Sequence, residues 1–498
     1  MSVISVNSLT FGYDGAADNI FENINLQLDT DWKLGLTGRN GRGKTTFLRL
    51  LAGELEYSGT ITSSVDFYRF PFAPKDDKLP AIDIIRSICS GREDWEIDCE
   101  LSQLGLVPAI AERSLCTLSG GERTKLLLSA MFLAENRFLL IDEPTDNLDW
   151  ETRELIGEYL SRKSGFILVS HDRALLDRCT DHIMSIDRSR ITVTKGNYSV
   201  WQREKELSDS RELEENRRLR KEISRLTDAA KRTAEWADRS ERKKIGFEPT
   251  KVEKSLTRRA YEGAKSKKAM ARAKAFEERS LKAAEEKSKL LKDIEKADAV
   301  SISPLEFHSS VLLSADKFGL SVGGRQLFEG KTFEVKQGDV IALCGNNGCG
   351  KSTFLRFICG EKEGITPSGQ LIMPSGLIIS YAPQSAEHLK GTLSEYAESL
   401  DIDLTRFLTI LRKLDFGRQH FAVRLEDMST GQRKKAQLAA SLASRAHLYV
   451  WDEPLNFIDV ISRTQIEELI KSCRPTLIFA EHDEMFRRNV GAKEIMLP

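Results

Sequence analysis

The stretch GRNGRGKTTFLRLLAGE at residues 38–54 decides the fold, because nearly the same letters return as GNNGCGKSTFLRFICGE at residues 345–361. The two copies lie 307 positions apart in a chain of 498 residues. Each copy follows a short apolar run and opens a helical pattern, which predicts a strand, a glycine-rich turn and a helix. A chain of this length holds two or three domains that each bury a core.

Other segments repeat in the same order. LLIDEPTDNLD at 139–149 returns as YVWDEPLNFID at 449–459, and LVSHD at 168–172 returns as FAEHD at 479–483. Apolar strands alternate with helical segments between these landmarks. The pattern predicts two α/β domains with largely parallel sheets, at 1–200 and 301–498.

The segment between the copies, 201–300, differs in composition. It holds 29 Lys and Arg against 21 Asp and Glu, and 239–274 alone holds 13 against four. Two apolar stripes of helical spacing, separated by Gly246 and Pro249, predict a long antiparallel helical hairpin with its tip near 244–258. A flexible charged linker is the alternative, and the apolar spacing argues against it.

The two glycine-rich loops fit the phosphate-loop pattern. Glycines let backbone N–H groups face phosphate oxygens, and the following helix adds its positive N-terminal end. Lys44 and Lys351 are predicted to reach the β- and γ-phosphates of ATP, and Thr45 and Ser352 to hold Mg²⁺. The predicted ATP-binding residues are Gly38, Asn40, Gly41, Gly43, Lys44, Thr45 and Thr46, and Gly345, Asn347, Gly348, Gly350, Lys351, Ser352 and Thr353.

Acidic residues close the strands that precede each DEP motif. Asp142 and Asp452 are predicted to hold Mg²⁺. The next residues, Glu143 and Glu453, are predicted to orient and polarise the attacking water. The matching histidines of the two later motifs, His171 and His482, complete the set of predicted catalytic residues.

With LSGGE at 118–122 and MSTGQ at 428–432, the sequence resembles the ATP-binding cassette (ABC) superfamily, with its motifs in order twice. The resemblance implies two cassettes that dock head to tail, each ATP lying between one Walker A loop and the signature of the other cassette. The implied first site combines Lys44, Asp142, Glu143 and His171 with Ser429, Gly431 and Gln432. The implied second site combines Lys351, Asp452, Glu453 and His482 with Ser119, Gly120 and Gly121.

The resemblance also implies that the two sites differ. The family expects a glutamine that contacts Mg²⁺ and water, and the second copy has Gln384 where the first has Phe72. The signature facing the first site has Thr430 in place of the usual glycine. We therefore expect slower or weaker hydrolysis at the first site.

The base-stacking residue is also expected to differ between the sites. Tyr13 is predicted to stack on adenine in the first cassette. Leu320 occupies the matching position of the second copy, so we expect another aromatic there, with Phe318 as the candidate.

Fused cassettes joined by a long basic hairpin resemble the ABC-F family, and GNYSVWQREK at 196–205 resembles its usual approach to the hairpin. No arm fits within the first cassette, and length and pattern most resemble the antibiotic-resistance members of the Lsa type. That resemblance implies binding at the exit (E) site of the 70S ribosome, near rRNA and P-site tRNA, and protection against lincosamides, streptogramin A and pleuromutilins. The predicted tip contacts are Lys243, Lys244, Phe247, Lys251, Lys254, Arg258 and Arg259.

Two other assignments remain open, a housekeeping ABC-F translation factor and the ATPase subunit of a transporter with separate membrane subunits. The apolar runs are too short to span a membrane, no signal peptide is visible, and eight scattered cysteines indicate a reducing cytoplasm. We expect a cytoplasmic, ribosome-associated monomer whose cassettes close on each other, without a membrane or DNA partner.

Overall fold

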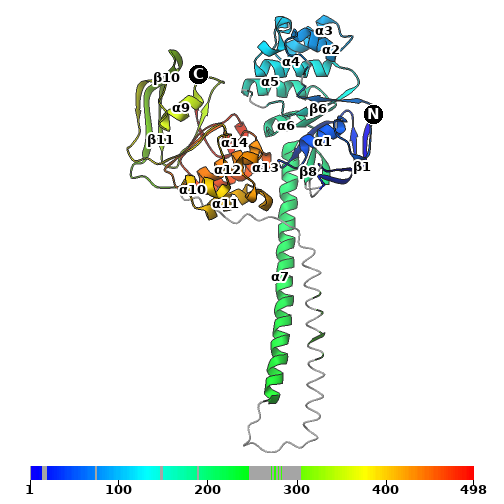
Figure 1. Cartoon of the computed structure of the whole chain (residues 1–498), viewed down its shortest axis with the longest axis vertical. Coiled ribbons are helices and arrows are strands. Elements are labelled where there is room, and N and C mark those ends of the chain that lie inside the picture. Colours follow the sequence, from blue (N-terminus) through cyan, green and yellow to red (C-terminus); the bar gives the residue numbers. More distant parts are fainter. Residues whose placement is uncertain are drawn as a thin grey trace, which may run out of the picture. The chain divides into compact units, whose positions relative to one another are not determined.

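The computed structural model describes residues 2–245 and 304–497, apart from 14–18, 73, 75, 146–147, 149, 188–189 and 415, together with residues 271, 274–275, 279 and 282. The two copies of the repeat form two α/β cassettes, as predicted (Figure 1). They belong to one compact unit, Met1–Trp201 with Ala297–Pro498, and Gln202–Lys296 forms a second unit.

The first cassette is built on a sheet with the strand order β5-β6-β7-β3-β8-β9, in which only β8 and β9 pair antiparallel. An antiparallel sheet of order β2-β1-β4 accompanies it. The strands are β1 Val3–Phe11, β2 Phe21–Asp29, β3 Lys33–Gly38, β4 Ser58–Thr62, β5 Asp66–Phe70, β6 Arg137–Asp142, β7 Phe166–Val169, β8 His182–Asp187 and β9 Arg190–Lys195.

The second cassette repeats this plan with a fully parallel main sheet of order β14-β15-β16-β12-β17 and an antiparallel sheet of order β11-β10-β13. In both cassettes the strand before the phosphate loop lies inside the main sheet, where carboxyl ends of parallel strands gather functional loops. The strands are β10 Val311–Val322, β11 Arg325–Lys336, β12 Val340–Cys344, β13 Ile365–Ile372, β14 Ile379–Ala382, β15 Leu448–Asp452, β16 Leu477–Ala480 and β17 Lys493–Met496.

Helices of corresponding length follow corresponding strands in the two cassettes. The first cassette contains α1 Lys44–Leu51, α2 Ala81–Ile88, α3 Asp94–Gln103, α4 Gly120–Leu133, α5 Trp150–Ser161 and α6 Arg173–Cys179. The second contains α9 Lys351–Ile358, α10 Leu393–Ser399, α11 Leu404–Lys413, α12 Thr430–Ala443, α13 Val460–Cys473 and α14 Glu484–Asn489.

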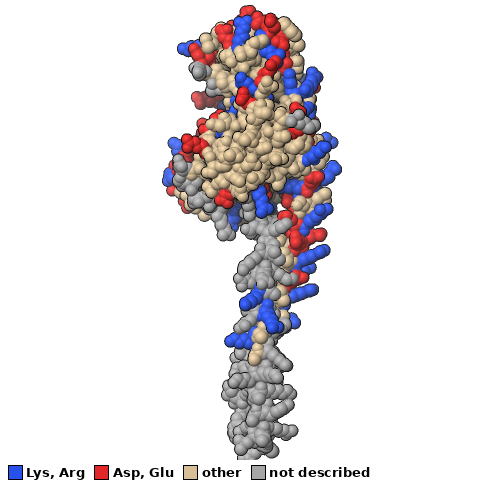
Figure 2. All heavy atoms as spheres, turned by 90° about the vertical axis from the view of Figure 1, so that its right-hand side faces the viewer, with Lys and Arg blue, Asp and Glu red and all other residues tan. Residues whose placement is uncertain are grey.

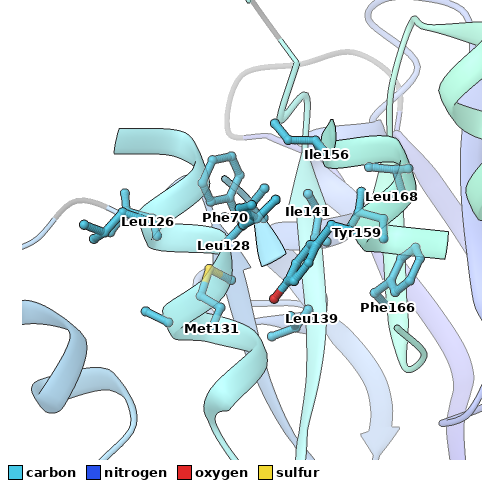
Figure 3. Packing of buried hydrophobic residues seen from close by; sticks show 14 of the residues in the cluster. Phe70, Leu126, Leu128, Met131, Leu139, Ile141, Ile156, Tyr159, Phe166 and Leu168 are labelled. Carbon is cyan, nitrogen blue, oxygen red and sulfur yellow. The ribbon is translucent and has the colours of Figure 1, made fainter. Parts of the chain in front are cut away.

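Strand β6 shows how the sequence builds the core. Its side chains alternate between the two faces of the sheet. Leu139 and Ile141 pack with α4 and α5, as Figure 3 shows, whereas Phe138 and Leu140 belong to the cluster on the opposite face. All four side chains are buried. The continuous apolar run of β6 is therefore explained by packing on both faces of the sheet.

Helix α7, Tyr198–Ile245, extends over 48 residues and supplies the first helix of the predicted hairpin. Its first turn is anchored in the first cassette, because Tyr198 and Trp201 are buried in the same core cluster as α4 and α5. Further along, the predicted apolar stripe is half-buried at Leu219, Ile223 and Leu226. None of the described helices has both the length and the apolar character of a membrane span.

Helix α7 carries 14 Lys and Arg and 11 Asp and Glu. Charges of both signs lie along the part of the helix that Figure 2 colours. Lys243 and Lys244 belong to this helix. The predicted return helix lies largely outside the described residues, and the tip residues Phe247, Lys251, Lys254, Arg258 and Arg259 lie outside them entirely.

The packing around β6 predicts the effect of truncating its side chains. We expect Leu139→Ala to destabilise the first cassette by about 2–5 kcal/mol, because it removes buried methyl groups and leaves a cavity. Val107→Ala is a matched control, since Val107 is 67% exposed and surface changes stay within about 0.5 kcal/mol. Urea denaturation followed by circular dichroism measures both, and equal midpoints would contradict the assignment of Leu139 to the core.

Candidate functional site

Each phosphate loop connects a buried strand to a helix, β3 to α1 and β12 to α9. The residues that cap these helices, Gly43 and Gly350, have φ of 88° and 102°, in the left-handed region that favours glycine. A Cβ on Gly43 would also lie 2.6 Å from Ile20 Cγ2. The turn therefore needs glycine, and it leaves a helix N-terminus open to an anion.

The two loop lysines are held inside their own loops. Lys44 Nζ donates to Gly38 O at 2.8 Å and to Asn40 Oδ1 at 3.2 Å, and Lys351 Nζ donates to Gly345 O at 2.7 Å. Burial lowers the pKa of Lys44, although nearby carboxylates oppose the shift. Both ammonium groups thus lie at the loops that the motif assigns to phosphate.

The predicted metal ligands meet in both cassettes. Asp142 hydrogen-bonds with Thr45, and Ser352 Oγ donates to Asp452 Oδ1 at 3.0 Å. Burial raises the pKa of both aspartates. Mg²⁺ takes hard oxygen ligands and commonly uses one or two protein ligands beside water and substrate phosphates. The donor sets fit Mg²⁺ that is bound together with ATP.

Glu143 and Glu453 occupy the same unusual backbone conformation, with φ of 47° and 45°. Such strain costs about 1–3 kcal/mol and gathers at functional positions. Both backbone N–H groups donate at 2.9 Å to the neighbouring strand, at Val169 O and Ala480 O. The recurrence of this strain at one motif position supports a functional constraint on the two carboxylates.

The two carboxylates have different partners. Glu143 Oε2 accepts from the His171 backbone N–H at 3.1 Å, and Glu143 Oε1 lies 3.3 Å from His171 Nε2. Burial and nearby cations lower the pKa of His171 well below its usual value, so the imidazole is neutral. Glu453 Oε2 instead accepts from Gln384 Nε2 at 2.8 Å and from Asn456.

Phe72 takes the position of Gln384 in the first cassette, as the sequence predicts. Its ring stacks on Tyr68, with centroids 5.6 Å apart, and packs on the core cluster around α4. The ring offers neither a metal ligand nor a hydrogen bond to Glu143. This difference supports the predicted inequality of the two sites.

The first phosphate loop lies against the second cassette. Asn40 Nδ2 donates to Phe457 O at 2.8 Å. A Cβ on Gly431 would lie 2.5 Å from the same carbonyl oxygen and 3.0 Å from Asn40 Nδ2, so this contact needs glycine. The structure thus brings together the first Walker A loop and the second signature, the pair that head-to-tail docking implies.

The signature serines cap the helices that follow them. Ser429 and Gln432 form a capping box at the start of α12, and Ser119 and Glu122 form one at the start of α4. Gln432 is therefore bound to the backbone of its own helix turn.

The first signature has a different surrounding in the described part of the chain. The nearest neighbours of a Cβ on Gly121 would be Leu148 and Thr152, both in the same cassette, at 3.7 Å. A Cβ on Gly120 would meet no described atom within 4 Å. The close approach across cassettes seen at Gly431 is thus not repeated at these two glycines.

Of the two residues suggested for stacking on adenine, Tyr13 lies at the surface and Phe318 is buried. Tyr13 is 44% exposed, and its hydroxyl lies 3.1 Å from Thr46 Oγ1, next to the first phosphate loop. Phe318 is the wrong candidate for the second site. It is 1% exposed and packs against Phe354 and Phe357, so its ring faces the core and has no surface for a base.

Comparison with known proteins matches the two repeats that carry the motifs. The family described as "ABC transporter" matches residues 21–146 and 328–456, together about half of the chain. The chain belongs to this family. It is an ATPase with two ABC cassettes, as its motifs predict.

The ribosome protection protein VmlR of Bacillus subtilis is 28% identical to this ABC protein over 503 residues, covering 97% of this chain and 85% of VmlR. The ATP-binding protein Uup of Escherichia coli is 24% identical over 542 residues, covering 98% of this chain and 79% of Uup. The predicted resemblance to ribosome-protection ABC-F proteins is therefore confirmed.

The solved structures show the same tandem fold. An archaeal ribosome recycling factor, aABCE1, crystallised with the ribosomal stalk protein aP1, aligns with a TM-score of 0.63 at 19% identity, covering 98% of this ABC protein and 87% of that chain. At this identity the likeness concerns the fold alone.

A buried group of charges between the cassettes was not found from the sequence. Arg173 of the first cassette forms an ion pair with Glu467 and lies 3.7 Å from Asp483, both in the second cassette. Arg463 Nη1 donates to Asp483 Oδ2 at 2.9 Å. Burial lowers the pKa of Arg173, but Asp483 and Glu467 outweigh it and hold that pKa above its usual value.

The ion pair has no counterpart related by the repeat. The motif offset puts Glu484 at the position of Arg173 in the second copy, and Gly157 at the position of Glu467 in the first. The sequence does show that the charges of Arg173 and Glu467 are not kept in the other copy. Neither Arg173 nor Glu467 belongs to a nucleotide-binding motif, however, so the motifs do not predict the ion pair.

Removing Arg173 tests this contact. We expect Arg173→Ala to destabilise the cassette pair by about 3–5 kcal/mol, because Glu467 loses its buried partner. Arg178→Ala is the matched control in the same helix. Its ion pair with Glu154 is exposed, and exposed pairs contribute about 0–1 kcal/mol. Urea denaturation compares the two, and an equally small effect of both variants would show that the Arg173 pair contributes little.

Proposed function

We propose that the protein is an ABC-F ATPase that binds the 70S ribosome at the E site and displaces antibiotics from the peptidyl-transferase centre through its interdomain hairpin. The proposed drug classes are lincosamides, streptogramin A and pleuromutilins. In this proposal the protein is a cytoplasmic monomer that alternates between open and closed arrangements of its cassettes.

One observation carries the proposal, the similarity to a ribosome protection protein over 97% of the chain. The similarity includes the interdomain segment as well as both cassettes. ATP-binding motifs alone would not distinguish a translation factor from a transporter subunit, because both use the same cassettes.

The charge of the interdomain segment fits an RNA partner. Lysines and arginines near phosphates release counterions on binding, which gives affinity that falls with salt. The basic excess gathers in 239–274, where we place contacts to rRNA and P-site tRNA. In this proposal the aromatic ring of Phe247 would stack on an unpaired base or contact the drug site.

ATP hydrolysis supplies the switch. In each site the loop lysine and the Mg²⁺ ligands would position the γ-phosphate, and Mg²⁺ would neutralise charge on the phosphate oxygens. Glu453, hydrogen-bonded to Gln384, is suited to orient the attacking water. Because the first turn of α7 is buried in the first cassette, movement of that cassette would be passed to the base of the hairpin.

Ribosome binding is tested with a variant that holds ATP without hydrolysing it. We expect Glu143→Gln/Glu453→Gln to copurify with 70S ribosomes in ATP, because the closed cassettes stay closed. The same variant without ATP is the control and should bind weakly. The recovered ribosomes are quantified from rRNA, at several salt concentrations.

Other outcomes of this pull-down separate the alternatives. Failure to enrich 70S ribosomes would falsify the translation assignment, and copurified membrane subunits would favour the transporter. Ribosome binding without any change in drug susceptibility of an expressing host would favour the housekeeping factor. Susceptibility to each of the three drug classes is measured with the wild type and the double variant.

The unequal sites make a second prediction. We expect Glu453→Gln to lower the ATPase rate about tenfold more than Glu143→Gln, because the second site has Gln384 beside its carboxylate and the first has Phe72. Steady-state phosphate release measures both variants. Glu363→Gln, at an exposed position of the second cassette, is the control. Equal losses from the two catalytic variants would count against the asymmetry.

A further inference from the structure

A lysine with no assigned role lies beneath the second ATP site. Lys434 of α12 is 1% exposed. Its Nζ donates to three backbone carbonyl oxygens, those of Pro383, Gln384 and Asp452, at 2.8, 2.9 and 3.4 Å. The ammonium group therefore connects the loop of the glutamine to the end of the strand that carries the predicted metal ligand.

A second side chain of the same helix holds the next residue of this loop. Gln437 is 3% exposed, and its Nε2 donates to Ser385 O at 3.2 Å. Together, Lys434 and Gln437 bind the consecutive carbonyl groups of residues 383–385. The loop backbone is thus fixed by α12, while the Gln384 side chain extends to Glu453.

The first cassette has neither side chain. At the motif-matched positions of α4 stand Thr124 and Leu127, and the matching loop carries Phe72. Phe72 is held by apolar packing. The two polar tethers and the glutamine thus occur together in one copy and are replaced together in the other.

We propose that Lys434 and Gln437 are positioning residues that hold the Gln384 loop so that its amide stays on the catalytic carboxylate of the second site. Lys434 is the main tether, because an ammonium group bound to several carbonyls makes stronger hydrogen bonds than a neutral amide. In this role Lys434 and Gln437 affect the rate of ATP hydrolysis and not the affinity for ATP. ATP affinity depends on the phosphate loop, which neither residue touches in the structure described.

Lys434→Met tests the tether, because methionine keeps an unbranched apolar stem and removes the three hydrogen bonds. We expect kcat to fall about tenfold or more, since small displacements of catalytic groups are costly, while KM for ATP changes less than about twofold. Gln437→Leu, which installs the residue of the first copy, should give a smaller fall in kcat. Lys434→Arg keeps the charge and the donors and should retain at least about a third of kcat.

A double-mutant cycle with Gln384→Ala separates positioning from general damage. If Lys434 acts through this loop, Lys434→Met should add less than about a twofold loss to Gln384→Ala. Lys390→Met, at an exposed lysine of the same cassette, is the control and should leave kcat unchanged.

The proposal is overturned if Lys434→Met keeps kcat within about twofold of the wild type, or if its loss adds fully to that of Gln384→Ala. A rise in KM in parallel with the fall in kcat would also overturn it, because that pattern indicates damage to the whole site. The test depends on ATPase activity alone, so its result stands apart from ribosome binding.

Discussion

The hydrogen bond from Asn40 to the carbonyl of Phe457 joins residues 417 positions apart and sets the conditions for the rest of the structure. It requires that the first phosphate loop and the loop after β15 of the other cassette meet within 2.8 Å. Gly431 accepts this approach only because it lacks a Cβ. The predicted first ATP site is therefore divided between the two cassettes, because its phosphate loop and its signature come from different copies of the repeat.

The two cassettes share a fold but do not present the same surface to each other. Arg173 and Glu467 are paired in one direction, whereas the repeat puts Glu484 and Gly157 in the other. Buried charges are tolerated only with partners, and the buried carboxylate of Glu467 has the guanidinium of Arg173 as its partner. Because the two copies have diverged in sequence, the contact between the cassettes is not symmetric. The residue differences between the two predicted nucleotide sites have the same origin.

Much of this architecture could be predicted, because the phosphate chemistry needs fixed residue types at fixed spacings. The motifs alone predict the loop glycines, the acidic pairs that begin at the last residues of β6 and β15, and Phe72 at the position that Gln384 takes in the second copy. Phe318 is the wrong candidate because strand register, which buries its ring, is set by pairing with distant strands. The sequence gives no local sign that Lys434 is buried, because lysine is rarely buried without partners and its partners lie in the distant loop at 383–385.

Helix α12 connects these observations, because it belongs to both sites. Its N-terminus, capped by Ser429, lies beside Asn40 of the first site. One turn further on, Lys434 holds the loop of Gln384 at the second site. Helix α4 has Thr124 and Leu127 at the matching positions, so the first cassette lacks this pair of polar side chains. Residues of α12 therefore contact both the first phosphate loop and the loop of Gln384, whose side chain is the partner of the second carboxylate.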